Sequence, residues 1–198
     1  MFHPHFHIAL AVPHIETAMA DLAATGVQWR DVLSYPLCVF HDAMESLVQI
    51  RSVYSSGDAP AIELFEGGAG TPMEAPIPGS HFHHIGVWTD DFSADVAKLQ
   101  TQGWELAATV ADEHGDPSTF ALHRTPFGFY LELVDPRWAG RLLGDLLPPQ
   151  LKDLPVTCAK PPHAERQAGP PSSRRSDESS VDAADVQPST HIGACRRA

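Results

Sequence analysis

Positive charge is scarce in the first 150 residues of this chain. They contain six basic and nineteen acidic residues, which gives a net charge of −13. A surface this acidic repels phosphate backbones and anionic lipid headgroups, so we expect no binding to nucleic acid or to a membrane surface. The few cations are then the groups best suited to receive a carboxylate or phosphate of a small-molecule substrate. We select Arg30, Arg51 and Arg124 as candidate substrate-binding residues.

Long apolar runs and a cysteine pattern are also missing. The N-terminal stretch MFHPHFHIALAV lacks a basic region, and no part of the chain reaches the length of a membrane span. The three cysteines are odd in number and show no CxxC spacing, which predicts no disulfide framework. These absences favour a cytoplasmic protein.

The end of the chain lacks apolar periodicity. From Pro155 onward it is dominated by Pro, Ser, Asp and Arg. Such a composition cannot bury enough apolar surface to offset the entropy lost on ordering. We therefore predict a folded domain over residues 1–150 and a disordered tail over 151–198.

What the chain does contain is an internal repeat. The segment HIALAVPHIETAMADLAATGVQW begins at His7, and HIGVWTDDFSADVAKLQTQGWEL begins at His84. The two align without a gap, and a glycine, Gly26 or Gly103, follows each histidine after nineteen residues. In each copy an alternating apolar run predicts a strand. The apolar 3–4 spacing that follows predicts a helix ended by a residue that tolerates positive φ.

Three more strand-like pieces follow each predicted helix. The last ones, AIELFE around Glu63 and YLELVD around Glu132, share an apolar-apolar-Glu-Leu-apolar-acid pattern. Each half therefore reads β-α-β-β-β, which predicts an α+β fold of two tandem βαβββ modules. The predicted strands are 7–12, 27–30, 47–54 and 61–65, and then 84–89, 104–110, 119–124 and 129–134. The predicted parts are module one (about 5–67), a connector (67–80), module two (about 81–135) and a C-terminal helix (about 136–147).

Strand alternation gathers four polar side chains. The apolar neighbours of Glu63 share one face of its strand, so the carboxylate lies on the opposite face, and the same argument applies to Glu132. Two modules related by a twofold axis would bring these glutamates together with His7 and His84 on one concave surface. Two neutral imidazoles and two carboxylates suit a divalent ion such as Ni, Co, Zn, Mn or Fe, and they leave positions open for water or substrate oxygens.

At these residues the chain resembles the vicinal oxygen chelate superfamily, which includes glyoxalase I, methylmalonyl-CoA epimerase, fosfomycin-resistance proteins and extradiol dioxygenases. The resemblance covers about residues 6–135 and rests on HIALAV, IELFE, HHIGVWTDD and GFYLELVD. It implies a curled mixed sheet around a metal site, with ligands at His7, Glu63, His84 and Glu132. It also implies that a homodimer is the expected assembly.

The resemblance distinguishes two adjacent histidines. His84 directly precedes the apolar run, as His7 does, and it is therefore the predicted ligand. His83 is expected to point the other way, because neighbouring residues of a strand alternate between its faces.

Glu63 decides which chemistry the resemblance favours. Extradiol dioxygenases and fosfomycin-resistance proteins use two histidines and one glutamate, which match His7, His84 and Glu132. A fourth ligand at Glu63 favours the glyoxalase and epimerase branch. Such a lyase, isomerase or epimerase stabilises an enolate during proton transfer beside a carbonyl group. Glu132 is our first choice for the group that moves the proton, and Glu63 is the second.

Two alternatives stay open. An extradiol-type dioxygenase would need an acid-base pair, for which His123 and Tyr130 are candidates. A non-catalytic drug- or metabolite-binding protein of the bleomycin-resistance type would need no full set of metal ligands. Four aromatic residues are candidates for a pocket wall or for the core: Phe40, Trp88, Phe120 and Phe127.

Overall fold

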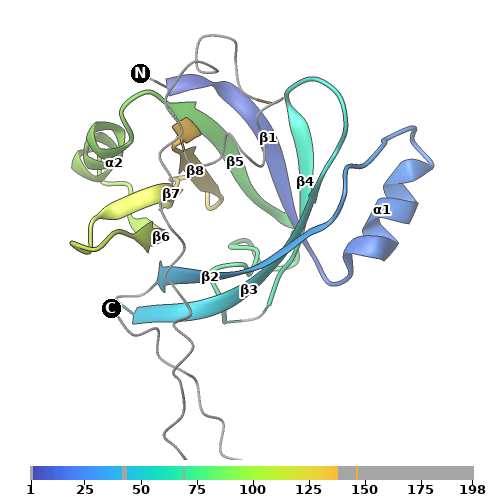
Figure 1. Ribbon diagram of the computed structural model, residues 1–198, viewed down its shortest axis with the longest axis horizontal. Helices are drawn as coiled ribbons and strands as arrows, with labels where there is room; N and C mark the ends of the chain where they lie inside the picture. The colour runs from blue at the N-terminus through green and yellow to red at the C-terminus, as the bar shows by residue number, and fades with distance from the viewer. Residues whose placement is uncertain (1, 42–43, 69, 138–145, 147–198) are drawn as a thin grey trace, which may run out of the picture.

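The structure is a computed structural model that describes residues 2–41, 44–68, 70–137 and 146 of the chain. Its helices and strands are labelled in Figure 1. They are β1 (Phe2–Val12), α1 (Ile15–Ala23), β2 (Leu33–His41), β3 (Met44–Tyr54), β4 (Ala61–Glu66), β5 (Phe82–Thr89), α2 (Phe92–Thr101), β6 (Leu106–Ala111), β7 (Pro117–Arg124) and β8 (Tyr130–Val134). This order is β-α-β-β-β twice, which confirms the predicted α+β fold of two tandem modules.

The second strand lies farther along the chain than predicted. The stretch 27–30 takes part in only one isolated bridge, and the strand is Leu33–His41 instead. The sequence did not indicate this strand, because it contains Pro36 and proline is disfavoured inside a sheet. β2 pairs with β3 over its whole length but with β6 only through Phe40 and His41. The rest of the β6-facing edge of β2 is not paired in the sheet, so a proline, which lacks an N–H group, is tolerated there.

The eight strands close into one barrel in the order β1-β4-β3-β2-β6-β7-β8-β5. Within each module the first and last strands pair in parallel, β1 with β4 and β5 with β8. The two modules meet at an antiparallel β1–β5 seam and at the short β2–β6 contact. The first strands of both modules therefore lie side by side, each with its own last strand on the other flank (Figure 1).

The two helices cover the outside of the barrel on different sides (Figure 1). Leu64 of β4 belongs to the apolar cluster under α1, and Leu133 of β8 belongs to the cluster under α2. Because strand residues alternate, the inner face carries their neighbours Glu63 and Glu132, as predicted. Neither described helix is long and apolar enough to cross a membrane.

A glycine follows each helix, as the repeat predicted. Gly26 has a φ of 93° and Gly103 has a φ of 83°. Left-handed backbone of this kind costs a residue with a Cβ atom about 1–2 kcal/mol. Glycine therefore lets the chain leave each helix and turn back towards the sheet.

Bulges in the β1–β5 seam shape its inner face. The register steps by one residue between His5 and His7 on β1, and by one residue between Phe82 and His84 on β5. A bulge adds a residue to one strand, so the side chains there no longer alternate strictly. The extra residues are the ones that directly precede His7 and His84 in the two modules.

Three further predictions concern the C-terminal region and the cysteines. Of the expected helix 136–147, the first two residues are helical. Leu146 is buried, and its carbonyl accepts a hydrogen bond from Trp88 Nε1 at 3.3 Å. The rest of this helix and the predicted tail 151–198 lie outside the described residues. Cys38 is disulfide-bonded, a single bond that the number and spacing of the cysteines did not indicate.

Candidate metal centre

The four predicted ligands come together inside the barrel. His7 lies on β1, Glu63 on β4, His84 on β5 and Glu132 on β8. The Nε2 atoms of His7 and His84 are 2.7 Å apart. Glu63 Oε2 lies 3.2 Å from His7 Nε2 and 3.4 Å from His84 Nε2, and Glu132 Oε2 lies 3.4 Å from both. Two imidazoles and two carboxylates of one chain therefore meet around one point.

The strand register explains why these side chains meet. Across the seam each histidine pairs with a small residue of the other module, His7 with Gly86 and His84 with Ala9. On their other flanks, Ala9 and Gly86 pair with the two glutamates. Each small residue thus lies between a histidine and a glutamate, and the missing side-chain volume leaves room for the imidazole ring.

This donor set fits a divalent metal ion. Metal–ligand bonds of about 2.0–2.2 Å place neighbouring donor atoms about 3 Å apart, and the contacts here run from 2.7 to 3.4 Å. His7, Glu63 and His84 are buried, and their donor atoms all lie within 4.8 Å of one another. Glu63 is buried and Glu132 is partly buried, and two carboxylates this close to each other are costly without a balancing charge. The residues could therefore hold a divalent ion whose charge the carboxylates balance.

The charged groups of the site act strongly on one another. Burial lowers the pKa of His84, but the carboxylates of Glu132 and Glu63 outweigh burial and raise this pKa to about 9. Burial raises the pKa of Glu63, but hydrogen bonds with His7 and His84 outweigh it and hold the pKa well below its usual range. At neutral pH a proton on His84 therefore stands in the place that a metal ion would take.

His83 does not point away from the site, contrary to the sequence prediction. Because of the bulge in β5, its ring packs inside the barrel against Phe65 and Tyr130, at centroid distances of 4.8 and 5.0 Å. Its Nδ1 lies 2.7 Å from His84 Nδ1, and its Nε2 lies 3.0 Å from the carbonyl oxygen of Pro72. Burial, and after it the neighbouring His84, lowers the pKa of His83 to about 3.

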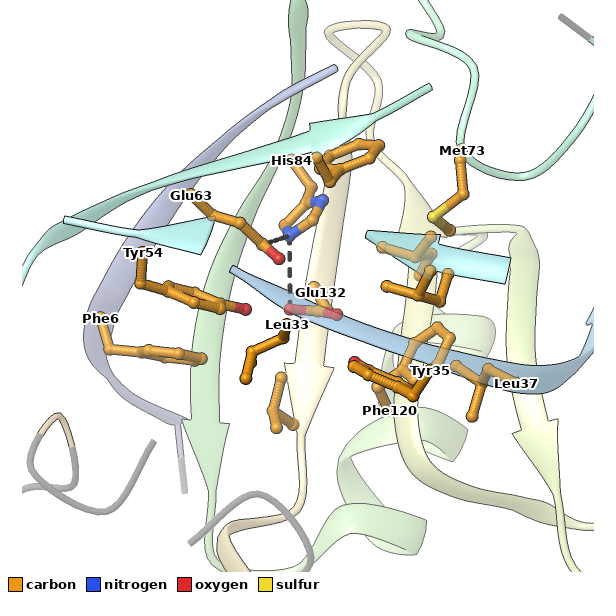
Figure 2. A pocket seen from close by; sticks show the side chains of 14 residues that line it. Phe6, Leu33, Tyr35, Leu37, Tyr54, Glu63, Met73, His84, Phe120 and Glu132 are labelled. Atoms are coloured by element: carbon orange, nitrogen blue, oxygen red, sulfur yellow. Dashed lines mark ion pairs between the residues drawn. The ribbon is translucent and has the colours of Figure 1, made fainter. Parts of the chain in front are cut away.

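A cavity of about 70 Å³ adjoins the donors, with Glu63, His84 and Glu132 in its wall (Figure 2). This volume holds the centres of several water molecules, so part of a small organic molecule fits. The other lining residues are apolar or aromatic: Phe6, Leu33, Tyr35, Leu37, Ile50, Tyr54, Phe65, Met73, Phe120, Leu122 and Val134. The cavity thus combines an apolar wall with a cluster of polar groups at one place.

Sequence reasoning missed two tyrosines at the site. Tyr35 and Tyr54 approach the carboxylates from different sides (Figure 2). Burial, followed by the charges of Glu63 and Glu132, raises the pKa of both phenols. Both hydroxyls therefore stay protonated at neutral pH and can donate hydrogen bonds to an oxygen atom. The strand of Tyr35 was not predicted, whereas Tyr54 ends a predicted strand and lies opposite Glu63 in the β3–β4 ladder.

The three arginines chosen from the sequence are not among the described residues that line this cavity. Arg51 forms ion pairs with two glutamates at 2.6 and 2.5 Å. Arg124 lies 3.4 Å from a carboxylate oxygen of Glu105, and Arg30 donates a hydrogen bond to the Ser55 carbonyl at 3.2 Å. Protein groups therefore engage all three guanidinium groups, and none of the three faces the cavity lining given above.

Of the four aromatic residues named from the sequence, only Phe120 lines the cavity. Trp88 stacks on Phe6 in the core at a centroid distance of 3.9 Å, which is core packing. Phe40 and Phe127 are exposed, at 37% and 77%. The wall is therefore built mainly from residues that the sequence did not single out.

His123, one of the two acid-base candidates for a dioxygenase, lies on the outer face of the barrel wall. It pairs with Leu106 and Leu131, which both pack in the apolar cluster under α2. Burial lowers its pKa to about 4. Tyr130 belongs to the inner cluster instead, so the two side chains do not face the four donors together.

The chain belongs to the Glyoxalase/Bleomycin resistance protein/Dioxygenase superfamily, whose sequence profile matches residues 6–122. This match confirms the resemblance found in the sequence, and the curled eight-stranded sheet agrees with it. Proteins of this superfamily commonly bind a divalent metal ion.

Solved structures similar to this chain include two methylmalonyl-CoA epimerases. A variant from Streptomyces coelicolor, in complex with 2-nitronate-propionyl-CoA, is 18% identical over 68% of this chain and 98% of its own, with a TM-score of 0.49. The enzyme from Mycobacterium tuberculosis is 18% identical over 68% of this chain and 92% of its own, with a TM-score of 0.46. No protein with a curated description matches the sequence.

Proposed function

We propose that the protein is a metal-dependent enzyme that removes a proton from a carbon atom next to a carbonyl group, as an isomerase, epimerase or lyase. The observation that carries the proposal is the meeting of two imidazoles and two carboxylates, with contacts of 2.7 to 3.4 Å, beside an apolar cavity. A divalent ion supplies, when bound, a Lewis acid that makes such a proton more acidic. The candidate ions are Ni, Co, Zn, Mn and Fe.

Glu132 is the group that we propose as the proton acceptor. Glu63 belongs to the tight cluster with both histidines and has the shorter contact, 3.2 Å to His7. The side chain of Glu132 is 15% exposed against 10% for Glu63. A general base must reach the substrate and release the proton again, so the more accessible carboxylate suits this role. We propose that the hydroxyls of Tyr35 and Tyr54, which also line the cavity, donate hydrogen bonds to a substrate oxygen.

The cavity wall supports a small, neutral substrate with apolar substituents beside two neighbouring oxygen atoms. A divalent ion and two carboxylates sum to zero charge, so the loaded site offers no excess positive charge to an anionic group. Leu33, Leu37 and Phe120 present carbon atoms to the cavity. Such a wall stabilises alkyl or aryl groups and leaves a phosphate or carboxylate without partners.

Two other functions fit the site less well. An extradiol-type dioxygenase that uses His7, His84 and Glu132 leaves Glu63 without a role, and its candidate His123 faces away from the donors. Binding of an apolar metabolite without catalysis agrees with the cavity wall, but it gives no reason for a buried and a partly buried carboxylate beside two histidines. Both functions are outcomes of the following experiment.

Metal-loaded protein is expected to exchange the proton beside a carbonyl group for solvent deuterium. The protein is reconstituted with each candidate ion, its metal content is measured, and neutral α-hydroxy ketones are followed in D₂O by NMR. Glu132→Gln should slow the exchange by about 10²–10⁴-fold, because it removes the general base. Glu105→Gln is the matched control, since this carboxylate is 69% exposed and lies away from the cavity.

The outcomes separate the three functions. Protein that holds no stoichiometric ion after reconstitution would overturn the proposal, and tight binding of apolar compounds by that protein would establish a binding function. Consumption of oxygen with catechols by the iron-loaded protein would establish a dioxygenase.

Metal affinity is expected to rise by about tenfold for each pH unit between about pH 7 and 9. The pKa of His84 is raised to about 9 in the metal-free site, so an ion that binds its Nε2 must displace one proton over this range. At higher pH the proton is already lost and the dependence levels off. Competition titrations against a chelator, corrected for the chelator's own protonation, measure the slope. An affinity that stays constant over this range would contradict the expectation.

A further inference from the structure

We propose that His83 is a positioning residue that fixes the tautomer and the orientation of His84, the histidine ligand of the second module. The inference rests on the metal-dependent function proposed above. His83 is not among the residues that line the cavity, so it acts through its contact with His84 rather than on the substrate.

A line of hydrogen-bonding groups runs from the connector between the modules to the donors. The carbonyl oxygen of Pro72 lies 3.0 Å from His83 Nε2, and His83 Nδ1 lies 2.7 Å from His84 Nδ1. The other nitrogen of His84, Nε2, is the atom that meets Glu63 and Glu132. Both nitrogens of both rings are therefore engaged along one line.

The direction of these hydrogen bonds follows from the carbonyl group of Pro72, which can act only as an acceptor. A carbonyl oxygen only accepts, so His83 must carry a proton on Nε2 and donate it to Pro72. The ring of His83 is fully buried between aromatic rings, which favours its neutral form, and in that form Nδ1 accepts. His84 must then donate from Nδ1, which leaves the lone pair of its Nε2 available to an ion.

The first module provides an internal comparison. Phe6 stands directly before His7, as His83 stands before His84, and both are the extra residues of bulges. The Phe6 ring packs edge-on against His7 at a centroid distance of 4.2 Å. His7 Nδ1 has no hydrogen-bond partner among the described residues. The same backbone position therefore supports one ligand by packing alone and the other by a directed hydrogen bond.

The test makes the second module like the first, with His83→Phe. Metal affinity, measured by chelator competition, should fall by about 10–100-fold, the usual effect of losing a group that orients a ligand. In NMR spectra of Zn²⁺-loaded protein, the Nδ1–H proton of His84 should lose the downfield shift and the slow exchange with solvent that its hydrogen bond to His83 gives it. His83→Gln should keep part of the affinity, because its amide oxygen can accept from His84.

His81→Phe is the matched control. His81 Nδ1 also bonds a backbone carbonyl, that of Ala11 at 2.8 Å, but it contacts none of the four donors. Its loss should leave the metal affinity within about twofold of the wild type, as expected for a side chain outside the ligand network.

An unchanged affinity and an unchanged His84 Nδ1–H resonance in a folded His83→Phe protein would overturn the proposal. If that variant does not fold, His83→Gln and His83→Met decide, because they have similar size, and glutamine carries a strong hydrogen-bond acceptor whereas the sulfur of methionine is a weak one. Equal affinities of these two would overturn the proposal as well. A wild-type protein that binds no metal would instead remove the proposed function itself.

Discussion

Gly86→Ala is expected to lower metal affinity by at least about 100-fold, more than the loss of a group that merely orients a ligand. Gly86 lies opposite His7 across the β1–β5 seam, and a Cβ atom there would overlap the imidazole ring, with even Nε2 only 2.7 Å away. Close-packed interiors do not absorb such an overlap, so the ring must turn its Nε2 away from the other donors. Chelator competition and the metal content after gel filtration measure the loss.

Gly68→Ala is the matched control, because its added methyl group would meet Thr71 at 3.5 Å, an ordinary contact. A double variant tests whether the loss of metal affinity is caused by displacement of His7. If Gly86→Ala acts by displacing His7, then adding it to His7→Ala should cause little further loss of affinity. Wild-type affinity in the Gly86→Ala protein would contradict a role of His7 as a ligand.

Metal loading is expected to raise the melting temperature by about 5–10 °C. An ion at about 100 times its dissociation constant adds about 2.7 kcal/mol to the free energy of unfolding. For a domain of about 150–250 residues, each kcal/mol shifts the melting temperature by about 2–4 °C. The donors come from the first and last strands of both modules, so unfolding disperses them and releases the ion. Circular dichroism during heating, with metal or with chelator, measures the shift.

Glu63→Gln should lose most of this stabilisation, because it removes one of the two charges that balance the ion. Glu105→Gln, the exposed control, should keep all of it. Equal melting temperatures with chelator and with every candidate ion would contradict a metal site at these residues.

The four donors could be found in the sequence because the patterns that place them are local. Alternation around Glu63 and Glu132 assigned each carboxylate to the inner face, and the repeat joined each to a histidine. Both steps need only the period of a strand and the equivalence of the two halves. The expected βαβββ order followed from the same patterns, and the structure has it.

The features that the sequence did not predict depend on irregular backbone or on distant partners. Because it contains Pro36, β2 was not predicted, and Tyr35 of this strand was therefore not recognised as part of the cavity wall. The bulge in β5 turned His83 inward, although strict alternation would have turned it outward. The scarcity of cations made Arg51 a candidate substrate-binding residue. Its two glutamate partners lie on α1 and at the end of β4, and only the folded chain brings them to it.

The division of the donors between the two modules also constrains how the protein can open and how it can change. Each module supplies one imidazole, one carboxylate and one strand of the β1–β5 seam. A local opening of either module would disperse the donors, so we expect the two modules to open together when an ion is bound. The sequences of the two modules therefore constrain each other at this seam. The glycine of one half is fixed by the ring of the other, and a substitution on either side of the seam must be tolerated by its counterpart.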